Sequence, residues 1–199
     1  MVMHSRATAQ PPAQLYTLEE FEAMPQFGEG YELIDGRLEK KPMPGFEHAA
    51  IADNIRDANK AYASPRKLGR VQREASITIG IPRNAPIPDL SFWKAERKVK
   101  IVKGAAPLPD LAVEVFSPGD LAGPTAFKSA MVKVKKLIQA GVPIVWVVNP
   151  DEQTVAVYHA GQPDAPVKTE GIKGEVDGEN VIPGFKMAVA DVFAVEEED

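Results

Sequence analysis

The chain contains Pro88-Asp89-Leu90-Ser91-Phe92 and, 17 positions after Phe92, the segment that begins Pro109-Asp110 and continues Leu111-Ala112-Val113-Glu114-Val115-Phe116-Ser117-Pro118. Each segment predicts a short strand bounded by prolines and carrying a carboxylate among apolar residues. Glu114 lies inside a run that is otherwise typical of a buried strand, where a carboxylate needs a cation, a metal or a proton beside it. Asp89 and Glu114, on two neighbouring strands, therefore indicate a site for a divalent metal with oxygen ligands.

The same carboxylates also admit simpler roles. Asp110 stands at the mouth of its strand, where a solvated end residue is ordinary. Glu114 could pair with a core lysine and have no catalytic role. Asp89 could be a turn residue that follows Pro88.

Composition predicts one soluble globular domain, because 199 residues with 44% hydrophobic and 26% charged residues are enough for a sizeable core. The absence of cysteine excludes disulfides, zinc–thiolate sites and a cysteine nucleophile. The net charge of −5 argues against a protein that covers nucleic acid through its overall charge.

We expect a disordered arm over residues 1–14, one domain over 15–195 and an acidic tail over 196–199. Neither a signal peptide nor a membrane span is apparent, so the expected compartment is the cytoplasm.

The N-terminal half predicts two helices and a hairpin. Thr17 and Glu20 form a capping box in front of a short helix, Leu18–Met24. Asp35-Gly36 between two strand-like runs is a strong hairpin signal. Apolar residues at helical spacing predict a second helix, His48–Ala63.

The rest of the chain predicts a mixed sheet. The expected strands are Gly69–Ile81 in its alternating part, Ile87–Trp93, Leu111–Phe116, Ile144–Val148 and Thr154–His159, with Val167–Gly171 and Gly178–Ile182 as edge strands or turns. A helix from Pro124 to about Ala140 separates two near-continuous apolar strands, which predicts that those strands are parallel, adjacent and central. The basic stretch Arg97–Lys103 is typical of a solvated strand face and could also contact phosphates.

A cation for Glu114 is expected on that helix. Phe116 stands where a lysine would complete the Asp…Glu-x-Lys pattern of metal-dependent nucleases. Lys133 borders the apolar stripe of the helix and could reach back over the ends of the strands; Lys128 is a second option. Lys135 and Lys136 are expected to face water, and an ordinary solvated position is also open for Lys133.

Several segments, taken in order, resemble the Uma family of restriction endonucleases with the PD-(D/E)xK fold. They are Tyr31–Leu38, His48, Pro88–Phe92, Asp110–Pro118, Lys133 before Gly141-Val142, and Trp146–Pro150. The resemblance runs from about Tyr16 to Phe193. It implies an α/β fold of the restriction-endonuclease type: a mixed central sheet flanked by helices, with an N-terminal hairpin and C-terminal antiparallel strands.

The resemblance also implies roles for residues. It makes Asp89 and Glu114 metal ligands and Lys133 the catalytic lysine, moved from strand to helix, while Glu32 and His48 occupy the family's other polar positions. From the residues alone, Glu32 could instead cap or pair across its hairpin, and His48 could be a cap-region or surface histidine near a helix start. We expect Glu32 and Lys133 in one pocket with the acidic pair and His48 at its rim.

The resulting functional expectation is a Mg²⁺- or Mn²⁺-dependent endonuclease that hydrolyses DNA, acts without a membrane and forms a homodimer. The alternative is a catalytically inactive nucleic-acid-binding or regulatory protein on the same fold, which the missing strand lysine favours. A homodimeric scaffold with a buried acidic pair is a third interpretation.

Overall fold

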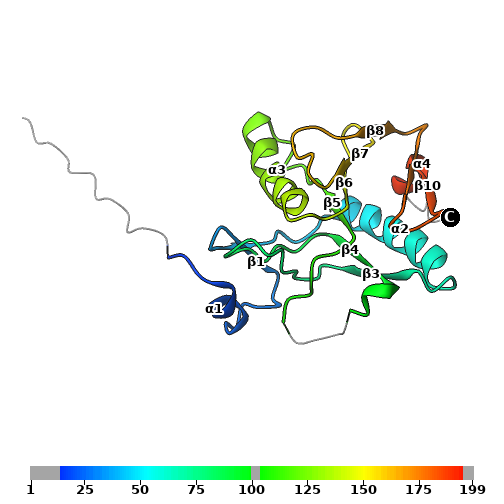
Figure 1. Ribbon diagram of the computed structural model, residues 1–199. Helices are drawn as coiled ribbons and strands as arrows, with labels where there is room; N and C mark the ends of the chain where they lie inside the picture. Colours follow the sequence, from blue (N-terminus) through cyan, green and yellow to red (C-terminus); the bar gives the residue numbers. More distant parts are fainter. Residues whose placement is uncertain (1–13, 100–103, 195–199) are drawn as a thin grey trace, which may run out of the picture.

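The computed structural model describes residues 14–99 and 104–194 of the chain. Its centre is a six-stranded mixed sheet with the strand order β3-β4-β5-β6-β7-β8 (Figure 1). The strands are β3 (Gly69–Arg73), β4 (Leu90–Lys94), β5 (Leu111–Val115), β6 (Ile144–Asn149), β7 (Thr154–His159) and β8 (Lys168–Gly171). β5 and β6 are parallel, and the other neighbours in the sheet are antiparallel. The predicted adjacent, central and parallel pair is therefore confirmed.

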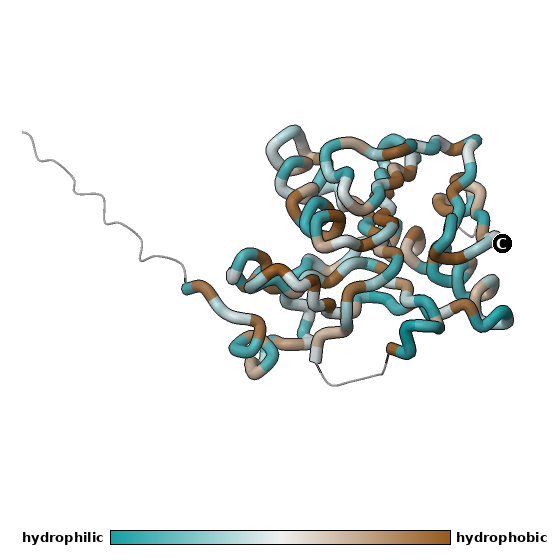
Figure 2. Tube along the Cα trace, in the orientation of Figure 1, coloured by the Kyte–Doolittle hydropathy of each residue, from teal (hydrophilic) through white to brown (hydrophobic). Residues whose placement is uncertain are grey.

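Two long helices cover opposite faces of this sheet. They are α2 (Phe46–Ala63) and α3 (Pro124–Gln139), and α3 connects β5 to β6. Side chains alternate along β5, so Leu111, Val113 and Val115 share a core with α2, whereas Ala112 shares the other core with α3. The two cores make the sheet the middle layer of the molecule, and hydrophobic residues concentrate along its central strands (Figure 2).

Smaller elements surround this frame. They are α1 (Leu18–Glu22), the hairpin of β1 (Tyr31–Ile34) and β2 (Arg37–Lys40), the 3-10 helix η1 (Ala95–Arg97), the antiparallel pair β9 (Glu175–Asp177) and β10 (Lys186–Ala188), and α4 (Val189–Val192). Thr17 caps α1 together with Glu20, as the sequence predicted. The hairpin turns at Asp35-Gly36, also as predicted. Among the described residues, no helix is both long and apolar enough to cross a membrane.

Several expected boundaries were wrong. The alternating run to Ile81 is not a strand: β3 ends at Arg73, Glu74 takes a positive φ of 48°, and only Ile77 forms a bridge, to Ala106. The apolar side chains at 77 and 79 are buried all the same, which explains the pattern without a ladder.

Some elements are displaced from their expected positions. α1 is shorter than Leu18–Met24, α2 begins two residues before His48, and β4 begins at Leu90 instead of Ile87. Residues 178–182 form turns, and the strands of that region are β9 and β10, which lie on either side of them. The expected basic strand face begins in η1, and its residues 100–103 lie outside the described residues, as do 1–13 of the expected arm and the expected acidic tail 196–199.

Candidate active site

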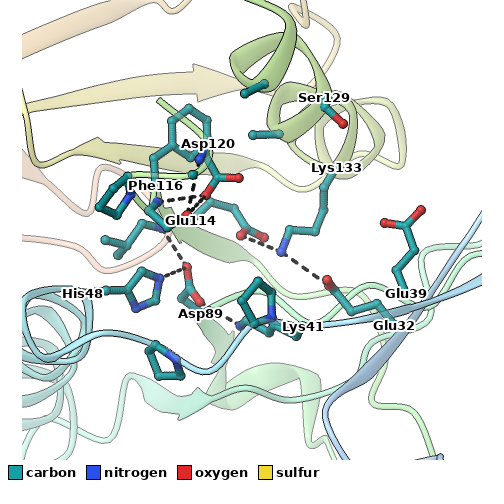
Figure 3. A pocket seen from close by; sticks show the side chains of 18 of the residues that line it. Glu32, Glu39, Lys41, His48, Asp89, Glu114, Phe116, Asp120, Ser129 and Lys133 are labelled. Atoms are coloured by element: carbon teal, nitrogen blue, oxygen red, sulfur yellow. Dashed lines mark hydrogen bonds and ion pairs between the residues drawn. The ribbon is translucent and has the colours of Figure 1, made fainter. Parts of the chain in front are cut away.

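A cavity of about 910 Å³ opens where the hairpin, the start of α2 and the first half of α3 meet the central strands. Its lining includes the five side chains singled out in the sequence, which are Glu32, His48, Asp89, Glu114 and Lys133. Figure 3 shows these side chains converging from the hairpin, α2, the residue before β4, β5 and α3. The fold therefore brings together residues that lie up to 101 positions apart in the chain.

Glu114 points into this cavity because of its place in β5. The residues on either side of it, Val113 and Val115, face the core under α2, so Glu114 faces α3. Its side chain is buried, and Oε2 lies 2.8 Å from the Nζ of Lys133. The other oxygen, Oε1, is buried and has no hydrogen-bond partner within the described chain. Glu114 thus offers one oxygen to an additional ligand.

Burial is the largest influence on the pKa of Glu114. Removal from water raises the pKa of this carboxyl to about 8, because the opposing charge of Lys133 compensates only in part and the charge of Asp89 adds to the rise. Burial alone would lower the pKa of Lys133, but Glu114, Glu32 and Asp89 together raise it above its usual range. Lys133 is therefore a permanent cation of the site.

Asp89 directly precedes β4 and is surrounded by donors. Its Oδ2 accepts the backbone N–H of Val115 at 2.7 Å and lies 3.4 Å from Nε2 of His48, while Oδ1 lies 2.7 Å from Nζ of Lys41. Burial would raise the pKa of Asp89, but His48, Lys41 and Lys133 outweigh it and hold that pKa well below its usual range. Asp89 is consequently ionised at all ordinary pH values.

His48 lies against Asp89 and is mostly buried, whereas the sequence placed it at the rim of the pocket. Burial alone would lower the pKa of its imidazole, but the hydrogen bond and charge of Asp89 reverse this and raise the pKa above its ordinary value. In the described part of the molecule Nδ1 is buried and has no hydrogen-bond partner. The surface-histidine alternative is thus wrong.

Glu32 connects the hairpin to the site. Its Oε1 accepts the backbone N–H of Ile87 at 2.5 Å and lies 3.4 Å from Nζ of Lys133. The residue opposite Glu32 in the hairpin is Glu39, which carries the same charge, so a favourable pair across the hairpin is not formed. Glu32 and Lys133 accordingly share the pocket with the acidic pair, as expected.

The other lysines of α3 lie outside the cavity lining. Lys128 is exposed and does not line the cavity, so the geometry favours Lys133 as the lysine of the site. Lys135 is half-buried, and its Nζ lies 3.5 Å from Oδ1 of Asp164. Lys136 was expected to face water, but its side chain is only 14% exposed and lies 2.6 Å from Asp35 of the hairpin turn.

Sequence reasoning missed Lys41, which follows β2 directly. A usable signal existed in the hairpin register, because Glu32 opposes Glu39 and side chains alternate. Lys41, two residues after Glu39, therefore shares the face of the hairpin that carries Glu32. What the sequence lacked was the docking of this face onto Asp89, 48 positions away.

The donor set fits a hard cation that keeps most of its water. Within residues 14–99 and 104–194, no group of three histidine, aspartate or glutamate side chains is arranged to enclose an ion. Mg²⁺ does not need such a cage, since it is commonly held by one or two carboxylates and several waters. The buried Oε1 of Glu114 has no hydrogen-bond partner among the residues that the structure describes, and the ionised Asp89 lines the same pocket, so the two provide this kind of site.

Comparisons with known proteins agree with the fold. The family model Uma2, described as "Putative restriction endonuclease", matches residues 18–190. The chain is also similar to a solved structure described as "a putative nuclease belonging to DUF820" from Anabaena variabilis ATCC 29413, with a TM-score of 0.70 and 25% identity. That similarity covers 89% of this chain and 97% of the other. None of the curated proteins compared with the chain matches it.

Proposed function

The chain belongs to the Uma2 family, as its motifs predicted, and from this premise we propose that it is a metal-dependent endonuclease that hydrolyses phosphodiester bonds of DNA. The family and the nuclease-like neighbour support nuclease function in general. The observation that carries the finer proposal is the ion pair of Lys133 with Glu114, whose second oxygen has no hydrogen-bond partner in the described residues, in a pocket that Asp89 also lines.

Asp89 and Glu114 would hold the metal, with waters in the remaining positions. Bound Mg²⁺ would supply Lewis-acid chemistry: polarisation of a phosphodiester and a lower pKa for a coordinated water. The chain's own residues would provide position and charge. Because Lys133 stays protonated, it acts as a fixed cation near the reacting phosphate and stabilises negative charge that develops there, instead of removing a proton.

Glu32 and His48 would act through these groups. Glu32 holds the ammonium of Lys133 from the side opposite Glu114, which restricts where that charge can lie. His48 lies 3.4 Å from Oδ2 of Asp89 and, when protonated, holds the carboxylate by charge against the N–H of Val115. We propose both as positioning residues.

The test is cleavage of supercoiled plasmid and of labelled oligonucleotides with Mg²⁺ or Mn²⁺, and with chelator as the control. Wild type should nick or linearise DNA only with metal. Asp89→Asn and Glu114→Gln should lose about 100-fold or more of that activity, while Lys135→Met should keep it. Cleavage that survives both carboxylate substitutions would exclude this site.

A second candidate function is nucleic-acid binding without catalysis. Its support is the neutralisation of both carboxylates by lysines, Lys133 at Glu114 and Lys41 at Asp89, together with the missing strand lysine at Phe116. DNA binding without cleavage under every metal condition would favour this candidate. The homodimer and the cytoplasmic location stay predictions; light scattering checks the first and fractionation of cells checks the second.

A further inference from the structure

Lys41 is a largely covered lysine to which the family-like motifs give no role. Its side chain is 11% exposed, and its Nζ lies 2.7 Å from Oδ1 of Asp89. The same ammonium donates to the carbonyl of Ile87 at 3.1 Å and lies 3.8 Å from Glu74. Figure 3 shows it beside Asp89, with a dashed line joining the two side chains.

The oxygens of Asp89 are unequally available. Oδ2 is taken by the N–H of Val115 and by His48, both of which belong to the protein framework. Oδ1 is the oxygen left for a ligand, and the ammonium of Lys41 already lies against it. Glu114 differs, since its Oε1 has no partner in the described residues. A cation that binds both carboxylates through these oxygens must therefore compete with Lys41 at Asp89 alone.

The contact between Lys41 and Asp89 is also of an exchangeable kind. Despite the short distance, Oδ1 receives no aligned hydrogen bond, so charge holds the two groups together more than directed bonding does. Lysine carries a compact charge on a flexible stem, which lets it move when a stronger cation arrives. Glu74, whose side chain is 45% exposed, offers a second carboxylate on the solvent side for the displaced ammonium.

We propose that Lys41 is an internal counter-ion of Asp89 that competes with the divalent cation and thereby sets the metal affinity of the site. This inference rests on the proposed function, because it requires that Asp89 and Glu114 bind a metal. It predicts that loss of Lys41 changes the metal affinity in the direction opposite to that expected for loss of a structural residue. Loss of a structural residue would disorder the site and weaken metal binding, whereas loss of a competing cation strengthens it.

The experiment is isothermal titration of Mn²⁺ into metal-free full-length protein at a single pH. Lys41→Gln keeps a donor for the Ile87 carbonyl but removes the charge, and should bind Mn²⁺ roughly tenfold more tightly than wild type, since a unit charge a few ångströms from the ion opposes its binding. Lys41→Arg keeps the charge and should stay close to wild type. Lys135→Gln, which removes a lysine paired with an aspartate outside the pocket, should leave the affinity unchanged.

Thermal melting provides a second measurement in case Lys41→Gln is unstable without metal. Saturating Mn²⁺ should raise the melting temperature of Lys41→Gln more than that of wild type. Equal or weaker Mn²⁺ binding by Lys41→Gln would overturn the counter-ion inference. Glu114→Gln distinguishes failure of the metal site from failure of the role of Lys41. If Glu114→Gln binds Mn²⁺ as tightly as wild type, the proposed metal site is wrong. If Glu114→Gln loses Mn²⁺ binding but Lys41→Gln shows no gain in affinity, only the role of Lys41 is wrong.

Discussion

Lys133 on α3 places its ammonium 2.8 Å from Glu114 on β5 and 3.4 Å from Glu32 on β1, so one lysine joins a helix, the central sheet and the hairpin. Strand alternation turns Glu114 toward α3, and the parallel crossover from β5 to β6 lays α3 over that face. The charge of the pocket is thus organised by the topology that builds the core.

Replacing Lys133 by Met tests this arrangement. Above a pH of about 8, where Glu114 is ionised, the substitution leaves its carboxylate buried without a cation, which should destabilise the metal-free protein by about 1–3 kcal/mol; uptake of a proton by Glu114 limits the loss. DNA cleavage should fall by about 100-fold or more, because the fixed positive charge is gone. Urea unfolding and the plasmid assay measure the two effects.

Lys128→Met is the matched control for this change. Lys128 lies on the same helix but is exposed and outside the cavity lining. Its replacement should change stability by less than about 0.5 kcal/mol and leave cleavage intact. Greater loss of cleavage in Lys128→Met than in Lys133→Met would reverse the assignment of the lysine.

Glu114 should make the stability of the metal-free protein depend on pH. Its folded pKa of about 8 lies above the ordinary value of 4.5, so between these values the folded chain binds a proton that the unfolded chain has released. The stabilisation is present below pH 4.5 and is lost as the pH rises through about 8. Glu114→Gln lacks this titration.

The free energy of unfolding of wild type relative to Glu114→Gln should therefore fall as pH rises, by up to about 1.4 kcal/mol per pH unit. Urea titrations with chelator at pH 5, 6, 7 and 8 measure the difference. Because Asp89 and His48 are present in both proteins, their titrations largely cancel. A difference that is flat across this range would show that Glu114 does not hold the extra proton.

Gly69→Ala should lower the stability of the fold without changing the metal affinity of the site. A Cβ at Gly69 would overlap the carbonyl oxygen of Trp93 and the ring of Phe92. We expect a loss of about 1–3 kcal/mol in unfolding free energy. Gly69 pairs with Lys94, at the end of β4 far from Asp89, so Mn²⁺ affinity should not change. Gly171→Ala, where the new methyl meets no atom within 4 Å, is the control and should be near neutral in both measurements.

Local signals in the sequence predicted much of this molecule correctly. The capping box at Thr17, the turn at Asp35-Gly36 and the apolar strands around Glu114 each depend on residues within a few positions of one another. The carboxylate in an apolar strand was informative because a buried charge requires a partner. The structure supplies that partner as Lys133.

Features that depend on distant docking were not predictable in the same way. Lys41 meets Asp89 only because the hairpin packs against the start of β4, and no local pattern fixes that contact. The alternation at Ile77 and Ile79 reflects burial without a strand partner along the whole run. Near the C-terminus, β9 and β10 are only three residues each, too short for a periodic signal.

Glu32 provides the last prediction, because one oxygen of this side chain serves two purposes. Oε1 accepts the N–H of Ile87, which fixes the hairpin to the sheet, and it also lies near Lys133. Glu32→Gln retains an acceptor for Ile87 but removes the charge, whereas Glu32→Ala removes both. Glu32→Ala should lose about 1–3 kcal/mol of stability, since a buried N–H is left without a partner. Glu32→Gln should lose less than about 1 kcal/mol of stability yet still reduce cleavage roughly tenfold, because Lys133 is then held from one side only.

Urea unfolding and cleavage assays on both variants show whether Glu32 acts on stability, on cleavage or on both. If Glu32→Gln keeps full cleavage while Glu32→Ala loses it in proportion to its instability, Glu32 holds the hairpin in place and does not position Lys133.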